Sequence, residues 1–263
     1  MNGFYEKLKT KPFVMAGPCV IESRDICFKI AEVCKKAAED VGFEYIFKAS
    51  FDKANRTSVN SYRGVGIDEG LKLFQEIKEA FNVPVVTDIH ESCQAEAVGE
   101  VCDVLQIPAF LCRQTDLLLA AGKTGRIVNI KKAQFLSAAD MIYPVEKVRS
   151  VGNENIMLTE RGTMFGYNNL VVDFRNLVDM AKIGIPVVMD ITHSTQRPGG
   201  LGGASGGNPE YAPYFAAASA AVGVRGFFTE THPDPSKALS DGANMVKLSD
   251  FKSLLEKISR HMV

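Results

Sequence analysis

Short runs of β-branched and aromatic residues recur along the chain, and most of them are apolar almost without interruption. A strand that is apolar on both faces is typical of a parallel sheet whose two sides are covered. The pattern predicts eight strands, at residues 13–17, 45–50, 84–89, 104–108, 127–132, 155–160, 185–191 and 226–230.

Segments with helical spacing of apolar residues lie between most of these strands, for example at 25–41, 69–81, 116–124 and 213–224. Residues 248–262, with Ser249 and Asp250 near their start, predict a closing helix. Alternating strands and helices indicate parallel strands joined by crossover helices. We therefore predict a (β/α)8 TIM barrel, with residues 1–263 as a single catalytic domain. A doubly wound open sheet is the alternative.

Two glycine-rich stretches do not favour that alternative. Neither GVGIDEG nor GGLGGASGG has the G-x-G-x-x-G spacing directly after a strand, and the chain contains no Walker A sequence. The glycines at 199–207 instead suit a loop after the seventh strand, where a lid over a ligand would lie.

Composition and charge exclude several classes of protein. With 46% hydrophobic residues, 23% charged residues and a net charge of −1, the chain fits a well-filled core and argues against disorder or general nucleic-acid affinity. We find no apolar stretch of signal-peptide length at the N-terminus and none long enough to span a bilayer. We expect a cytoplasmic protein with no nucleic-acid or membrane partner.

The 6 cysteines include no CxxC pair, and a chain of 263 residues does not need disulfides for stability. We expect most of them to be reduced. Cys27 and Cys34 fit one buried helix face. Cys19, which follows Gly17 and Pro18, could be a small core residue or a group that takes part in chemistry.

Polar side chains gather where the predicted strands end. In a (β/α)8 barrel the chemistry lies at the carboxyl ends of the strands, so this placement predicts a site there. The residues at or just beyond the strand ends are Cys19, Lys48, Lys53, Asn55, Arg56, Asp88, His90, Arg113, Lys131, Lys132, Arg161, His193, Glu230 and His232.

Many of these residues are cations, although the net charge of the chain is only −1. A cluster of converging cations repels itself unless anions occupy it, and phosphates and carboxylates are the groups that Arg and Lys bind best. We expect more than one anionic group to bind at a cluster formed by Lys48, Lys53, Arg56, Arg113, Lys131 and Arg161.

A second group of residues, Cys19, His193, Glu230 and Asp241, offers ligands for a metal ion. The strands that precede the first three become neighbours when a barrel closes, and Asp241 lies in the loop beyond the last strand. One thiolate, one imidazole and two carboxylates can hold divalent Fe, Mn, Zn or Co without a linear motif.

Several longer strings strongly resemble the 3-deoxy-D-manno-octulosonate 8-phosphate synthase family, over residues 12 to 245. They are AGPCVIES, FKASFDKANRTS, YRGVGIDEGL, TDIHE, QIPAFLCRQTDLLLAA, TERGTMFGYNNLVVDFRN, DITHSTQRPGG and ETHPDPSKALSDG. The resemblance implies a (β/α)8 barrel that assembles as a homotetramer. It also implies condensation of phosphoenolpyruvate with arabinose 5-phosphate and water, with release of phosphate, for lipopolysaccharide synthesis.

The resemblance further implies a metal class. Metal-dependent members carry Cys where this chain has Cys19, whereas metal-independent members carry Asn. His193, Glu230 and Asp241 match the other ligands, and Ser240 is consistent with the metal-dependent class. The ion would either orient the sugar aldehyde or activate water, and the sequence does not choose between these roles.

The family motifs also assign residues to the substrates. Lys53, Lys131 and Arg161 would hold phosphoenolpyruvate, with Lys48 and Gln134 nearby, and Asp88 and His90 would line the centre of the pocket. The sugar phosphate would be bound by Asn55, Arg56 and Thr57. Phe110 and Arg113 would reach a neighbouring subunit's site, and the loop 194–207 would close over the pocket.

Two other functions compete with this interpretation. The related synthase that uses erythrose 4-phosphate shares the barrel, but it typically has a KPRT-like string where this chain has KANRTS. A barrel that binds phosphosugars without catalysis is the second, and the presence of every expected site residue argues against it.

Overall fold

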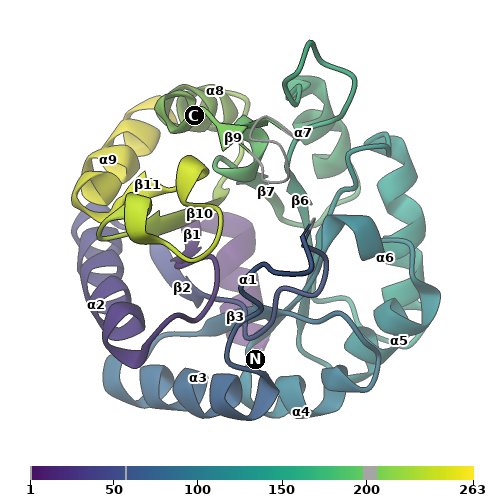
Figure 1. Ribbon diagram of the computed structural model, residues 1–263. Helices are drawn as coiled ribbons and strands as arrows, with labels where there is room; N and C mark the ends of the chain where they lie inside the picture. The colour runs from purple at the N-terminus through teal and green to yellow at the C-terminus, as the bar shows by residue number, and fades with distance from the viewer. Residues whose placement is uncertain (1, 57, 198–205) are drawn as a thin grey trace.

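The computed structural model describes residues 2–56, 58–197 and 206–263. Its centre is a closed barrel of parallel strands, in which each strand pairs with the next along the chain and the last pairs with the first (Figure 1). This confirms the predicted (β/α)8 TIM barrel. The barrel strands are β1 (Phe13–Gly17), β2 (Glu44–Lys48), β3 (Val85–Asp88), β4 (Val104–Ile107), β5 (Ile127–Lys131), β6 (Ile156–Glu160), β7 (Val187–Asp190) and β10 (Gly226–His232).

Helices surround the barrel, and each barrel strand is followed along the chain by one of them (Figure 1). Three shorter strands lie outside it: β8 (Gln196–Arg197) pairs with β9 (Gly206–Gly207), and β11 (Val246–Lys247) pairs in parallel with the end of β10. The α-helices are α1 (Asn2–Thr10), α2 (Arg24–Val41), α3 (Ile67–Phe81), α4 (Gln94–Val101), α5 (Thr115–Lys123), α6 (Ile142–Arg149), α7 (Phe174–Ala181), α8 (Ala212–Ala221) and α9 (Phe251–His261).

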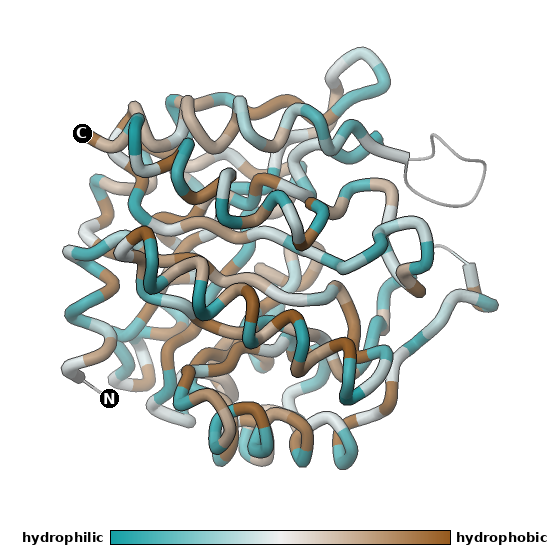
Figure 2. The backbone as a smooth tube through the Cα atoms, turned by 90° about the vertical axis from the view of Figure 1, so that its left-hand side faces the viewer, coloured by the Kyte–Doolittle hydropathy of each residue, from teal (hydrophilic) through white to brown (hydrophobic). Residues whose placement is uncertain are grey.

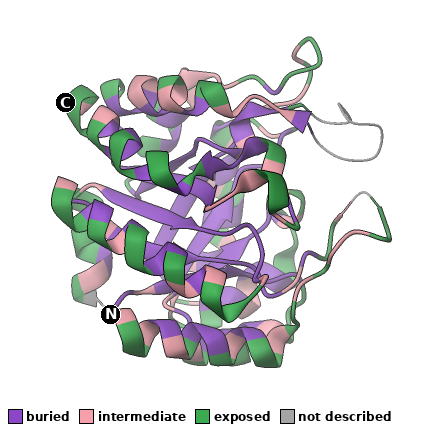
Figure 3. Ribbon diagram, turned by 60° about the vertical axis from the view of Figure 1, so that its left-hand side comes forward, coloured by how far each residue is buried: buried purple, intermediate pink, exposed green. Residues whose placement is uncertain are grey.

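The helix α2 shows how the sequence builds this outer layer. The Ser23 side chain accepts a hydrogen bond from the Ile26 N–H and caps the helix, which ends at Gly42 in the left-handed conformation. Cys27 and Cys34 are fully buried on one face, as predicted. Hydrophobic and hydrophilic residues alternate along the outer helices (Figure 2), and the strands beneath them are buried (Figure 3).

The helical spacing of apolar residues did not single out α1, α4, α6 or α7 in the sequence. The last three are only 8 residues long, so each offers few repeats of the helical period. The helix α1 lies across the amino end of the barrel, and its Tyr5 hydroxyl donates a 2.8 Å hydrogen bond to the Ile156 carbonyl. None of the helices in the described part of the chain combines the length and apolar character needed to cross a bilayer.

The barrel interior changes character along its axis. Near α1 it is filled by an apolar cluster, and towards the carboxyl ends the inward positions become polar. Because alternate residues of a strand point to the same face, Ile46 is followed inward by Lys48, Val86 by Asp88, and Phe228 by Glu230. The apolar members are Tyr5, Leu8, Phe13, Met15, Ile46, Val86, Val104, Ile127, Met157, Val188 and Phe228.

Candidate active site

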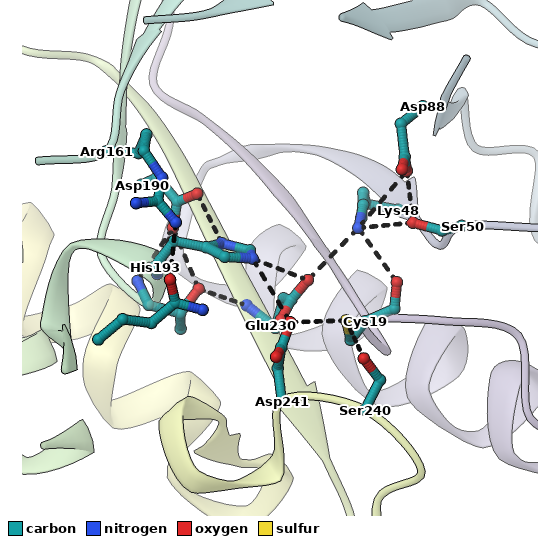
Figure 4. A network of polar contacts seen from close by, with 12 residues as sticks. Cys19, Lys48, Ser50, Asp88, Arg161, Asp190, His193, Glu230, Ser240 and Asp241 are labelled. Carbon is teal, nitrogen blue, oxygen red and sulfur yellow. Dashed lines mark hydrogen bonds and ion pairs between the residues drawn. The ribbon is translucent and has the colours of Figure 1, made fainter. Parts of the chain in front are cut away.

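Buried charged side chains meet at the carboxyl end of the barrel, as predicted (Figure 4). The apolar cluster of the barrel interior excludes water from one side of these charged groups, and the ring of Phe228 contacts two of them. The Lys131 ammonium lies 3.7 Å and the Lys48 ammonium 5.3 Å from the centroid of its ring. The charged residues that the strands and the following loops place here are Lys48, Lys53, Asp88, His90, Lys131, Arg161, Asp190 and Glu230.

Four donor groups gather on the side formed by β1, β10 and β7. One ligand atom each from Cys19, Glu230 and Asp241 lies within 4.8 Å of the other two. The Cys19 sulfur is 3.2 Å from Oδ2 of Asp241. Nε2 of His193 lies 3.6 Å from Oε1 of Glu230 and 3.9 Å from Oδ2 of Asp241. The predicted ligands are therefore brought together by the closure of the barrel.

Local backbone features hold these donors in place. A Cβ atom on Gly17 would collide with the Lys48 carbonyl, so only glycine lets β1 approach β2 this closely just before Cys19. Asp241 adopts a φ of 50°, a left-handed conformation that is uncommon for residues other than glycine. Such strained positions cluster at functional sites.

The electrostatics of this cluster suit a cation. Burial raises the pKa of the Cys19 thiol, and the carboxylates of Glu230 and Asp241 raise it further. A bound metal ion would reverse that effect, since it stabilises the thiolate. Oε2 of Glu230 is buried and has no hydrogen-bond partner among the described residues. The donor set and this free oxygen both fit a divalent ion.

The Lys48 ammonium joins this cluster to a second one. Its Nζ lies 3.4 Å from Oε1 of Glu230 and donates to the Cys19 carbonyl and to Oγ of Ser50. The Ser50 hydroxyl donates in turn to Asp88. Burial alone would raise the pKa of Asp88, but Lys48 and Lys53 hold it well below its usual range. Asp88 is therefore a carboxylate, with Nε2 of His90 3.3 Å away.

Asp190 connects the metal-ligand side with the anion side, and the sequence analysis missed it. Its Oδ2 lies 2.6 Å from Nζ of Lys131 and 2.8 Å from Nδ1 of His193. Burial lowers the pKa of the Lys131 ammonium, while Asp190 opposes that shift. The signal was available, since Asp190 follows the inward-facing Val188 by one strand period at the end of β7.

Arg161 has an unused donor in the pocket. Its Nη2 donates a 2.7 Å hydrogen bond to Gln196, while its buried Nη1 has no partner among the described residues. A buried guanidinium nitrogen without an acceptor is costly, and an anionic ligand would satisfy it. Lys53 lies nearby: burial would lower the pKa of its ammonium, but Cys19 and the surrounding carboxylates raise it above its ordinary value.

The residues assigned to the sugar phosphate lie further out. Asn55 is exposed, and Nη1 of Arg56 lies 3.1 Å from Oδ1 of Asp241. Thr57 and residues 198–205 of the loop 194–207 lie outside the described residues. The described ends of that loop pair with each other, through β8 and β9.

Gln134 is buried, and its carbonyl accepts a hydrogen bond from the Met164 N–H. Phe110 and Arg113 are exposed. Within the described ranges, no hydrogen bond or ion pair joins the Arg113 side chain to the cluster, so the structure does not bring all six predicted cations together.

Lys132 corrects one expectation. The sequence placed it at the rim of the barrel beside Lys131, but its fully buried ammonium turns away from the site. There it donates to the carbonyls of Ala133 and Leu136 and lies 3.4 Å from Oε1 of Glu160. Neighbouring residues of an extended segment point to opposite faces, which separates Lys132 from Lys131.

Comparison with known proteins supports the resemblance seen in the sequence. A family model described as "DAHP synthetase I family" matches residues 8–262. The 2-dehydro-3-deoxyphosphooctonate aldolase of Cyanothece sp. is 56% identical over 249 residues, which cover 94% of this chain and 91% of that protein. The proteins of that name from Fusobacterium nucleatum and Nitratidesulfovibrio vulgaris are 55% and 52% identical, over 94% and 98% of this chain and 89% and 94% of their own lengths. The chain therefore belongs to the DAHP synthetase I family and, within it, to the 2-dehydro-3-deoxyphosphooctonate aldolases, also called 3-deoxy-D-manno-octulosonate 8-phosphate synthases.

Proposed function

We propose that this barrel condenses phosphoenolpyruvate with D-arabinose 5-phosphate and water. The products are 3-deoxy-D-manno-octulosonate 8-phosphate, a precursor for lipopolysaccharide, and inorganic phosphate. The observation that carries this proposal is the buried cationic pocket at the carboxyl end of the barrel, where Nη1 of Arg161 has no partner in the described chain. Both substrates are anions, and the pocket needs anions to satisfy it.

Lys53, Lys131 and Arg161 would hold the carboxylate and phosphate of phosphoenolpyruvate, assisted by Lys48 and Gln134. All of them are buried. Charge–charge contacts are stronger in such a water-poor pocket than in solvent. The donors are already oriented, so little reorganisation is needed as charge develops on the departing phosphate.

Asn55, Arg56 and Thr57 would bind the sugar phosphate at the outer edge of the pocket. Anchoring the far phosphate there would place the aldehyde over the enol carbon and reduce the entropic cost of the encounter. Arg113 and Phe110, which are exposed here, would complete the site of a neighbouring subunit in a homotetramer.

The bond changes define what these residues must do. Carbon 3 of the enol bonds to the aldehyde carbon as the carbon 2–carbon 3 double bond is consumed, and the aldehyde oxygen takes up a proton. Water adds at carbon 2 and gives up one proton. The bond from carbon 2 to the phosphate oxygen then breaks, and the new hydroxyl loses its proton to form the ketone. Lys131 and Arg161 would neutralise the leaving phosphate. Asp88 and His90, which lie 3.3 Å apart, would orient the water and accept its proton.

The metal-dependent class is part of this proposal. Cys19, His193, Glu230 and Asp241 would hold a divalent ion, Fe, Mn, Zn or Co, and Asp190 would orient the His193 ring from its other nitrogen. Such an ion polarises a bound oxygen or lowers the pKa of bound water.

Chelation tests the metal assignment. We expect phosphate release to disappear in chelator-treated protein and to return with Mn²⁺ or Co²⁺. Cys19→Ala should not recover, whereas Cys93→Ala should behave as wild type, because Cys93 is an exposed cysteine. Full activity of metal-free wild-type protein would refute the metal-dependent class.

The choice of sugar phosphate tests the reaction itself. We expect faster phosphate release with arabinose 5-phosphate than with erythrose 4-phosphate. A strong preference for erythrose 4-phosphate would assign the chain to the related synthase reaction. Binding of both substrates by metal-loaded protein without turnover would instead indicate a non-catalytic phosphosugar-binding barrel.

A further inference from the structure

We propose that Glu22 is a positioning residue that ties together the three chain segments carrying Cys19, Glu230 and Asp241, and thereby determines how tightly the barrel retains its metal ion. This inference rests on the proposed metal site. Glu22 is not one of the four ligands, and its side chain is only 5% exposed.

One carboxylate oxygen of Glu22 holds the loop that carries Asp241. Oε1 accepts a 3.0 Å hydrogen bond from the Leu239 N–H, and Leu239 shortly precedes Asp241. Glu22 itself shortly follows Cys19, in the segment after β1. A single side chain therefore spans the two loops that bring a sulfur and a carboxylate oxygen to within 3.2 Å of each other.

The other oxygen faces the end of the strand that carries Glu230. Oε2 of Glu22 lies 3.5 Å from Nε2 of His232, and this nitrogen makes no hydrogen bond within the described ranges. His232 is buried at the end of β10, and its Nδ1 contacts the backbone nitrogen and carbonyl of Asp234, at 3.0 and 2.7 Å. His232 thus continues the connection from Glu22 into the start of the loop that carries Asp241.

This loop needs such an anchor. Between β10 and β11 its regular structure is limited to two short 3-10 turns, Pro235–Lys237 and Gly242–Asn244, and Asp241 between them is in the left-handed conformation. The Asp241 carboxylate itself contacts Arg56, which is assigned to the sugar phosphate, and the proposed ligands Cys19 and His193. A loop ordered before the ion binds loses less conformational entropy on binding, so the anchored site has the higher affinity.

Cobalt binding tests the proposal at a single fixed pH. Metal-free wild type, Glu22→Ala and Glu22→Gln are titrated with Co²⁺ in competition with a chelator, and the thiolate-to-cobalt absorption band reports coordination by Cys19. We expect Glu22→Ala to bind Co²⁺ about 10- to 100-fold more weakly than wild type, the range seen when outer-shell partners of metal ligands are removed. At saturation its band should match that of wild type, because the ligands are unchanged.

Glu22→Gln separates the two contacts of the side chain. It keeps an oxygen for the Leu239 N–H but loses the charge that faces His232, so we expect a loss of affinity that is measurable and smaller than that of Glu22→Ala. Glu154→Ala removes an exposed carboxylate elsewhere and should leave the cobalt affinity unchanged. If Glu22→Ala does not fold, Glu22→Gln decides the matter alone.

The possible failures can be told apart. Wild-type cobalt affinity in both Glu22 variants, or in Glu22→Gln alone when it is the variant that folds, would overturn the positioning role. If wild type shows no thiolate-to-cobalt band, or Cys19→Ala binds Co²⁺ as tightly as wild type, the proposed metal site itself is wrong.

Discussion

The ion pair between Lys132 and Glu160 offers a quantitative test of how the site is supported. Both side chains are fully buried, with Nζ 3.4 Å from Oε1. The same Oε1 accepts the N–H groups of Arg161 and Gly162, and Oε2 accepts a hydrogen bond from Asn176. The pair therefore connects the segment after β5 with the backbone that presents Arg161 to the pocket.

Lys132→Met removes the counter-ion and leaves the carboxylate buried. Two unit charges 3.4 Å apart attract each other by about 5 kcal/mol at an effective dielectric constant of roughly 20. Removing one partner of a buried pair typically costs about 3–5 kcal/mol. We expect about 3 kcal/mol here, the lower end, because three N–H groups still donate to Glu160. The double variant Lys132→Met/Glu160→Gln should cost less than the sum of the single variants, since it leaves no unpaired charge.

Urea unfolding at fixed protein concentration measures these losses. Far-ultraviolet circular dichroism is the suitable signal, because the chain contains no tryptophan whose fluorescence could report unfolding. Arg149→Ala is the matched control: its ion pair with Glu154 is exposed and should contribute no more than about 1 kcal/mol. A loss for Lys132→Met no larger than that for Arg149→Ala would refute the reasoning, as would additive effects in the double variant.

Further outcomes follow from single residues. Burial is the main cause that raises the pKa of Tyr5 from 10.0 to about 12, so the contribution of its hydroxyl to stability is complete below pH 10.0 and is lost towards pH 12. The difference in urea midpoint between wild type and Tyr5→Phe should therefore shrink over that range. A difference that stays constant with pH would contradict this. Asp190→Asn should lower kcat/KM for phosphoenolpyruvate by about 10- to 100-fold in a phosphate-release assay, because Lys131 and His193 lose the charge that they share; a change below about twofold would count against this. In a thiol-reagent titration of the native protein, Cys93 should react and the buried cysteines should not, unless denaturant is added.

Much of the fold could be predicted from periodicity. The strand from Val187 to Asp190 lies inside the predicted range 185–191, and that from Ile127 to Lys131 inside 127–132. Strands that are apolar throughout leave only one favourable arrangement, in which both of their faces are covered. The order of strands then follows from the short crossover connections, which place each strand beside the next.

The predicted site followed from one rule, that polar residues at the carboxyl ends of barrel strands converge. This rule located Cys19, His193, Glu230 and Asp241, which the structure brings together although they are far apart in the chain. It did not find Asp190 or Glu22, because a carboxylate that binds other side chains has no motif of its own. Its partners are known only once the chain has folded.

The sequence by itself determined the barrel, the end at which its chemistry lies, and the residue types that meet there. Those properties depend on local periodicity and on the order of residues along the chain. Only the tertiary structure decided which of two adjacent lysines enters the pocket: Lys131 reaches Asp190, whereas Lys132 is buried against Glu160. The physical reason is that both faces of the strand are apolar here. The side chains packed against each face therefore decide which lysine ammonium meets a carboxylate on that side.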